Sequence, residues 1–134
     1  MVAASIEKRN IELTSDVAAD LPLVKGDHTK LMQLMLNILK NSIEAIDVES
    51  IEKNISVTAR KCDDKLFIQV KDSGRGFDAA TASQIFKKGF TSKFSSSGLG
   101  LYNCRIIAES HDAKIDVTSE GTDKGAIATV SFKI

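Results

Sequence analysis

Two asparagines one helical turn apart, Asn37 and Asn41, are the first residues in the sequence suited to chemistry. With Lys40 and Glu44 they fall on one side of a predicted helix whose remaining surface is mostly apolar. A polar stripe of this kind usually faces water, but asparagine is a poor helix former, and a solvated stripe would favour Glu, Lys or Gln. Two amide oxygens on one side of a helix can ligate a hard cation such as Mg²⁺. The stripe alone leaves both interpretations open.

A carboxylate and two glycines form the second group, because Asp72 follows a predicted strand and precedes Gly74 and Gly76. An aspartate at the floor of a pocket accepts a hydrogen bond from an exocyclic amine, which favours adenine as the ligand. Glycines without side chains let a flat base lie against the backbone. An ordinary turn is the alternative, since Asp and Gly dominate turns for reasons unrelated to ligands.

The third group opens a second predicted helix and consists of Ser97, Gly98, Leu99, Gly100 and Leu101. Free backbone N–H groups and the positive end of the helix dipole point at such a loop, and glycines let phosphates approach the backbone. Nearby lysines could add positive charge, namely Lys87, Lys88 and Lys93. A plain serine-capped helix is the alternative. Neither a G-x-x-x-x-G-K-[ST] string nor a G-x-G-x-x-G string occurs in the chain.

Hydrophobic periodicity predicts the elements that position these groups. Asp27 is expected to cap a helix that runs to about Ile46. Two alternating segments, Ile55 to Ala59 and Leu66 to Val70, predict paired strands that turn at Asp63-Asp64. Beyond them we expect a short helix near 79–86, a long helix near 98–110 and strands at 114–119 and 126–134. With one further strand before the first helix, the order of elements is β-α-β-β-α-α-β-β. This order predicts an α/β (α+β) two-layer sandwich, with a mixed, largely antiparallel sheet and its helices on one face.

Composition limits the function classes. The 134 residues are 43% hydrophobic, enough for one domain with one core, residues 1–10 being interpreted as a linker. Eighteen basic residues balance eighteen acidic ones, so no global field favours nucleic acid or an anionic membrane. Apolar runs shorter than a bilayer span and a start without a signal-like centre lead us to expect a cytoplasmic domain without membrane contact. Cys62 and Cys104 lack CxxC spacing and are interpreted as buried or incidental thiols.

Four motifs follow one another in a fixed order: Asn37-x-x-x-Asn41, Asp72-x-Gly74-x-Gly76, Phe86-x-x-x-Phe90 and Gly98-Leu99-Gly100-Leu101. In this order they resemble the N, G1, F and G2 boxes of the Bergerat ATP-binding fold, which histidine kinases, gyrase-type ATPases and related chaperones share. The resemblance extends over nearly the whole chain and is strongest to the catalytic ATP-binding domain of sensor histidine kinases. The string Phe90-Thr91-Ser92-Lys93 is similar to the F-T-T-K string of kinases related to the nitrogen-regulation sensors.

The resemblance implies roles for the matching positions. Asn41 would ligate Mg²⁺, and Asn37 and Lys40 would lie beside the phosphates of ATP. Asp72 would bind the adenine amine in a pocket that Gly74 and Gly76 shape. Phe86 and Phe90 would pack the base of a lid over the nucleotide, although plain core packing is the alternative for both. The rest of the implied ATP site comprises Thr91, Ser92 and Lys93 in the lid and Ser97, Gly98, Leu99, Gly100 and Leu101 at the helix start.

The implied function is to donate the γ-phosphate of Mg-ATP to a histidine on a separate dimerisation domain of the same full-length kinase, with a response regulator receiver domain as the next partner in two-component signalling. Asn37 stands where gyrase-like ATPases carry a glutamate that activates water, and an amide cannot act as a general base. We therefore expect little autonomous ATP hydrolysis. We also expect the domain to be a monomer, because the resemblance implies that dimerisation lies in a separate helical hairpin.

The histidines of the chain do not match the phosphoacceptor of the family. His28 lies at the start of the first helix, and His111 follows the second, so both are interpreted as structural. The string His111-Asp112-Ala113 resembles the family's H-G-G turn with its glycines replaced. Three alternatives keep the ATP site but change its use: an anti-sigma-factor-type serine kinase, a non-catalytic ATP-binding sensor or scaffold, and a gyrase-like switch ATPase.

Overall fold

The structure is a computed structural model that describes residues 9–18, 21, 26–46, 52–82, 84, 100–121 and 123–133. Within these residues the elements follow the predicted order: β1 (Glu12–Val17), α2 (His28–Ala45), β2 (Asn54–Cys62), β3 (Lys65–Asp72), α3 (Ala79–Ala82), α4 (Gly100–Ser110), β4 (Lys114–Thr118) and β5 (Ala126–Lys133). None of these helices is long and apolar enough to cross a membrane.

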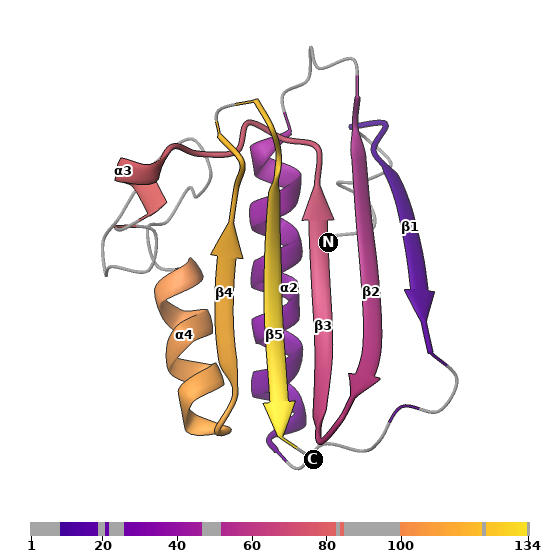
Figure 1. Ribbon diagram of the computed structural model, residues 1–134, viewed down its shortest axis with the longest axis vertical. Coiled ribbons are helices and arrows are strands. Elements are labelled where there is room, and N and C mark those ends of the chain that lie inside the picture. The colour runs from indigo at the N-terminus through magenta and orange to yellow at the C-terminus, as the bar shows by residue number, and fades with distance from the viewer. Residues whose placement is uncertain are drawn as a thin grey trace.

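The strands form one mixed sheet in the order β1-β2-β3-β5-β4. The pair β1 and β2 is parallel, and the other neighbouring pairs are antiparallel. Figure 1 shows α2 and α4 on one side of this sheet, with α2 behind β3 and β5. The predicted two-layer architecture, with a largely antiparallel sheet and its helices on one face, is confirmed.

The core lies between the sheet and α2. Leu34 and Ile38 of α2 are buried against side chains that point to the helix face of the sheet, such as Ile55, Val70 and Val130. Neighbouring residues in β3 alternate between this face and the open one, so Lys71 is exposed while Val70 and Asp72 are buried. The same alternation that fills the core therefore brings Asp72 to the layer of α2.

Local chemistry explains where the elements begin and end. Asp27 caps α2 as predicted, because its side chain accepts a hydrogen bond from the backbone N–H of Lys30 at 3.1 Å. Asp63 begins the predicted turn between β2 and β3 with a φ of 56°. The helix α3 is shorter than predicted: Asp78 caps it through Thr81 at 2.8 Å, but it ends at Ala82, and Gln84 lies in a turn. The β-branched Thr81 near its end is a weak helix former, which favours an early stop.

Candidate functional site

The predicted site residues divide between described and undescribed parts of the chain. Gly100 is the first described residue of α4, and Leu101 follows it in the same turn. The motif residues of α2 and of the loop after β3 are described as well. The remaining predicted site residues lie outside the described residues: Phe86, Phe90, Thr91, Ser92, Lys93, Ser97, Gly98 and Leu99.

Packing between α2 and α4 brings the asparagine motif close to the described residues of the fourth motif, Gly100 and Leu101. The backbone N–H of Asp27 donates to Nε2 of His111 at 3.0 Å, and the thiol of Cys104 lies 3.6 Å from the carbonyl oxygen of Leu34. Asp27 and Leu34 are seven residues apart, as are Cys104 and His111, and the order of the two contacts is reversed between the segments. The two helices therefore run antiparallel in a constant register. Gly100 lies four residues before Cys104, and Ile38 lies four residues after Leu34. The start of α4 is therefore level with the turn of α2 that runs from Ile38 to Asn41.

The asparagine stripe is not simply solvated. Lys40 is exposed, whereas Asn37 and Asn41 are both half-buried. Burial raises the pKa of the Cys104 thiol to about 12, and the side chain of Asn37 acts in the opposite direction. The nitrogen Nδ2 of Asn41 is buried and has no hydrogen-bond partner among the described residues. A buried polar atom without a partner costs about 1–3 kcal/mol, so this amide is suited to a partner that a ligand would bring.

Asp72 is a buried carboxylate at the end of β3. Its side chain is 7% exposed, and Oδ1 accepts a hydrogen bond from the backbone N–H of Gly74 at 2.8 Å. Burial raises the pKa of the Asp72 carboxyl above its ordinary value of 3.8, while hydrogen bonds from Gly74, the Ser42 hydroxyl and the Ala126 backbone act in the opposite direction. A rigidly held acceptor of this kind can select a ligand that offers an N–H group.

The glycines after Asp72 are explained by protein packing. A Cβ on Gly74 would stand 2.5 Å from the carbonyl oxygen of Ala45, and one on Gly76 would meet Gly121 and Ser119. Gly76 also has a φ of 60°, which favours glycine. We expected these glycines to make room for a flat base. The sides where their Cβ atoms would stand are instead filled by the end of α2 and by the β4–β5 connection.

Backbone hydrogen bonds hold the loop after Asp72 from both sides. On the α2 side, the N–H of Arg75 donates to the carbonyl oxygen of Ala45 at 2.9 Å. On the other side, the N–H of Gly125 donates to the carbonyl oxygen of Gly74 at 3.0 Å. The loop is therefore a fixed bridge between the asparagine helix and the far end of the sheet.

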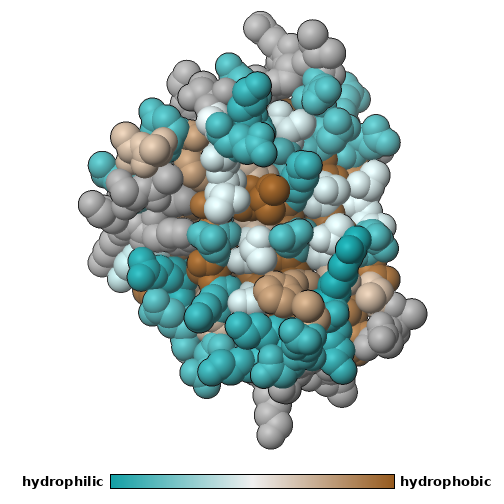
Figure 2. Space-filling model, viewed as in Figure 1, coloured by the Kyte–Doolittle hydropathy of each residue, from teal (hydrophilic) through white to brown (hydrophobic). Residues whose placement is uncertain are grey.

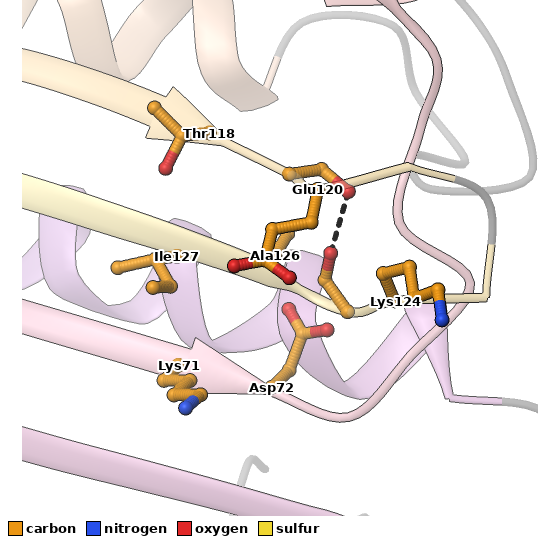
Figure 3. Close-up of a pocket in the computed structure, with 9 residues that line it drawn as sticks. Lys71, Asp72, Thr118, Glu120, Lys124, Ala126 and Ile127 are labelled. Carbon is orange, nitrogen blue, oxygen red and sulfur yellow. Dashed lines mark hydrogen bonds between the residues drawn. The ribbon is translucent and has the colours of Figure 1, made fainter.

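Ser119 was missed by sequence reasoning. Its Oγ accepts hydrogen bonds from the backbone N–H groups of Phe77 at 3.1 Å and Gly121 at 3.2 Å, and it donates to the carbonyl oxygen of Gly125 at 2.6 Å. The last contact is the dashed line in Figure 3. A lone serine after a strand carries no motif, so its role in closing the β4–β5 connection depends on tertiary contacts.

A cavity of about 230 Å³ lies on the open face of the sheet. Lys71, Ile127 and Thr118 are cross-strand neighbours along its floor, and Figure 3 shows α2 behind these strands. Figure 2 shows that hydrophilic residues dominate this face of the molecule. Of the predicted site residues that the structure describes, only Asp72 lines this cavity. The cavity is therefore distinct from the region where α2 and α4 meet. In the part of the chain that the structure describes, no three His, Cys, Asp or Glu side chains gather to hold a metal.

Comparison with known proteins assigns the family. Residues 26–134 match the family described as histidine kinase-, DNA gyrase B- and HSP90-like ATPases, and the chain belongs to it. It is a histidine-kinase-type ATPase domain. Sensor histidine kinase ZraS of Klebsiella oxytoca is 34% identical over 130 residues, and sensor histidine kinase TmoS of Ectopseudomonas mendocina is 32% identical over 118 residues.

These relatives are longer proteins. The matched part takes up 96% of this chain but 27% of ZraS, and 86% of this chain but 12% of TmoS. Among solved structures, the catalytic domain of histidine kinase ThkA superposes with a TM-score of 0.82 at 26% identity, covering 98% of this chain and 84% of that one. The fold and the use of ATP thus agree with the expectation from the four motifs.

Proposed function

We propose that this domain binds Mg-ATP where α2 and α4 meet and presents the γ-phosphate to a histidine on another domain of a longer kinase. The observation that carries the proposal is the buried Nδ2 atom of Asn41, which lies level with the start of α4 and has no hydrogen-bond partner in the described part of the chain. The first N–H groups of α4 have no partners within the helix and suit an anion. A nucleotide with its metal would satisfy both groups at once.

Each motif then has one task. Asp72, held by the backbone N–H of Gly74, accepts a hydrogen bond from the adenine amine. Asn41 holds Mg²⁺, and Asn37 lies beside the phosphates. Rotation of the Asn41 side-chain amide by half a turn exchanges its oxygen and nitrogen, so the oxygen can face the metal. Mg²⁺, when bound, neutralises charge on the phosphates. Lys40 adds positive charge from the exposed edge of the stripe.

The described residues favour transfer to a distant acceptor over hydrolysis. Asn37 offers no general base, and the Asp72 carboxylate, held by the backbone N–H of Gly74, is assigned to adenine in this arrangement. Phosphoryl transfer depends mainly on positioning and charge neutralisation, so a site without its own base suits an acceptor that another domain brings.

The wider signalling context is also part of the proposal. A receiver domain of a response regulator is the next acceptor of the phosphoryl group. We also propose that the chain belongs to the branch related to nitrogen-regulation sensors, which the Phe90-Thr91-Ser92-Lys93 string supports. The longer relatives named as sensor histidine kinases support a phosphoacceptor domain within the same protein.

Calorimetric titration with a non-hydrolysable ATP analogue, with and without Mg²⁺, tests the site. We expect Asp72→Asn to abolish adenine recognition and Asn41→Ala to remove the effect of Mg²⁺. Asp116→Asn is the matched control, because Asp116 is exposed on β4 and faces the open side of the sheet. A folded parent protein that binds no nucleotide would overturn the proposal. Binding without transfer to a supplied phosphoacceptor domain would favour a nucleotide sensor instead.

A further inference from the structure

His111 links the ends of the two helices that carry the proposed nucleotide site. Its Nε2 accepts the hydrogen bond from the backbone N–H of Asp27, while Nδ1 lies 2.8 Å from the carbonyl oxygen of Ile107 and 3.1 Å from Oγ of Ser110. A nitrogen that accepts from an N–H group carries no proton, so Nδ1 carries the proton and donates to Ile107. The contacts therefore select a single tautomer of the ring.

The ring also packs tightly on the residue before the helix cap. A Cβ on Gly26 would stand 2.8 Å from Nε2 of His111 and 2.9 Å from Cδ1 of Leu31. Gly26 therefore lets the imidazole lie directly against the backbone that leads into α2. Hydrogen bonding and packing together fix the start of α2 against the end of α4.

This link acts at a distance on the site. Asp27 starts the helix that carries Asn37 and Asn41, and His111 ends the helix that begins at Gly100. Because both helices are rigid and antiparallel, fixing one pair of ends sets the register at the other pair. Cys104 lies between the two ends, and its thiol packs against the backbone of Leu34.

We propose that His111 is a positioning residue, which holds the start of α4 level with Asn41 so that phosphates and metal can be bound together. The inference rests on the proposed nucleotide site. Displacement of bound groups by about 1 Å can cost about a hundredfold in a positioned reaction, so a small slip of α4 has a large effect. His111 itself touches no nucleotide in this arrangement.

Two substitutions separate the link from the imidazole itself. His111→Leu removes both hydrogen bonds, and we expect it to weaken binding of the Mg-bound ATP analogue by about tenfold. His111→Gln keeps an acceptor that can reach the N–H of Asp27, so its affinity should remain within about threefold of the parent. His28→Leu is the matched control, because His28 is an exposed imidazole at the same end of α2. All affinities are measured at a temperature where each variant is folded.

The thiol of Cys104 gives a second readout that is independent of nucleotide. In a Cys62→Ser background, alkylation of Cys104 requires α2 and α4 to separate, because this side chain is fully buried. We expect alkylation to be faster in His111→Leu than in His111→Gln or the parent. If His111→Leu does not fold, Gly26→Ala displaces the ring from the other side and should give the same two effects.

The outcomes distinguish this inference from the proposed function. A folded His111→Leu variant that binds the analogue as tightly as the parent would overturn the positioning role. A parent that binds no nucleotide defeats the proposed function and, with it, the role in binding. The ¹⁵N shifts of His111 in the ligand-free protein then still test the link itself, since a protonated Nε2 would contradict the hydrogen bond from Asp27.

Discussion

The carbonyl oxygen of Ala45 stands 2.5 Å from the point that a Cβ atom would occupy on Gly74. We therefore expect Gly74→Ala to force apart the end of α2 and the loop after β3. Overpacking of this kind costs about 1–3 kcal/mol, which urea unfolding would measure as a lower free energy of unfolding. Affinity for the ATP analogue should fall as well, because Asp72 moves with the loop.

An opposite result has a clear meaning. Replacing glycine by alanine at an unstrained, open position raises stability by about 0.4–1 kcal/mol, because the unfolded chain loses freedom. Increased stability of Gly74→Ala would show that the loop and Ala45 are not in close contact.

The buried carboxyl of Asp72 predicts two opposite pH dependences. Burial raises its pKa, so the folded state binds this proton more tightly than the unfolded state. Between the ordinary value of 3.8 and the raised value, stability therefore falls as pH rises. Affinity for adenine should rise over the same interval, because an ionised carboxylate is the stronger acceptor. Thermal unfolding and analogue titration across this interval measure the two slopes.

Asp72→Asn serves as the reference for both slopes. It removes the titration of this carboxyl but leaves the titration of the nucleotide phosphates unchanged. We expect a higher unfolding midpoint than the parent at neutral pH, together with lost adenine recognition. A variant that keeps the parent's slopes would show that Asp72 is not the titrating group.

The turn after α4 predicts a stabilising substitution. Asp112 has a φ of 53°, and the hydrogen bonds from its N–H to Glu109 and from that of Ala113 to Ala108 form a Schellman motif. Glycine adopts this left-handed conformation without strain, so Asp112→Gly should raise the free energy of unfolding by about 1 kcal/mol. Asp116→Gly also removes an aspartate, but from within β4, where glycine should cost about 0.5–1 kcal/mol. Urea unfolding measures both free energies of unfolding. A fall in this free energy for Asp112→Gly as large as that for Asp116→Gly would contradict the prediction.

Much of the fold was predictable because its signals are local. A capping aspartate, an apolar stripe and a two-residue turn identified α2 and the β2–β3 hairpin, and the structure places their ends within three residues of the prediction. The order of elements was then sufficient to predict a mixed sheet with helices on one face. Each of these features depends on residues a few positions apart.

The features that sequence reasoning missed depend on distant residues. Asp27 and His111 are 84 positions apart, and the contact between Gly74 and Ala45 also joins separate elements. A histidine after a helix and a glycine after an aspartate look the same whether or not such neighbours exist. The motifs therefore predict where the site lies, while the packing of its glycines and of His111 needed the folded structure.

The parallel pairing of β1 with β2 has a consequence for how the chain folds. Strands β2 and β3 are joined by a two-residue turn and can pair early, whereas β1 reaches β2 only after all of α2 has been placed. Loop closure is the slow element of such a crossover. Strand β1, which lies at an edge of the described sheet and pairs across this crossover, is thus expected to join the folding nucleus last and to lose its amide protection first.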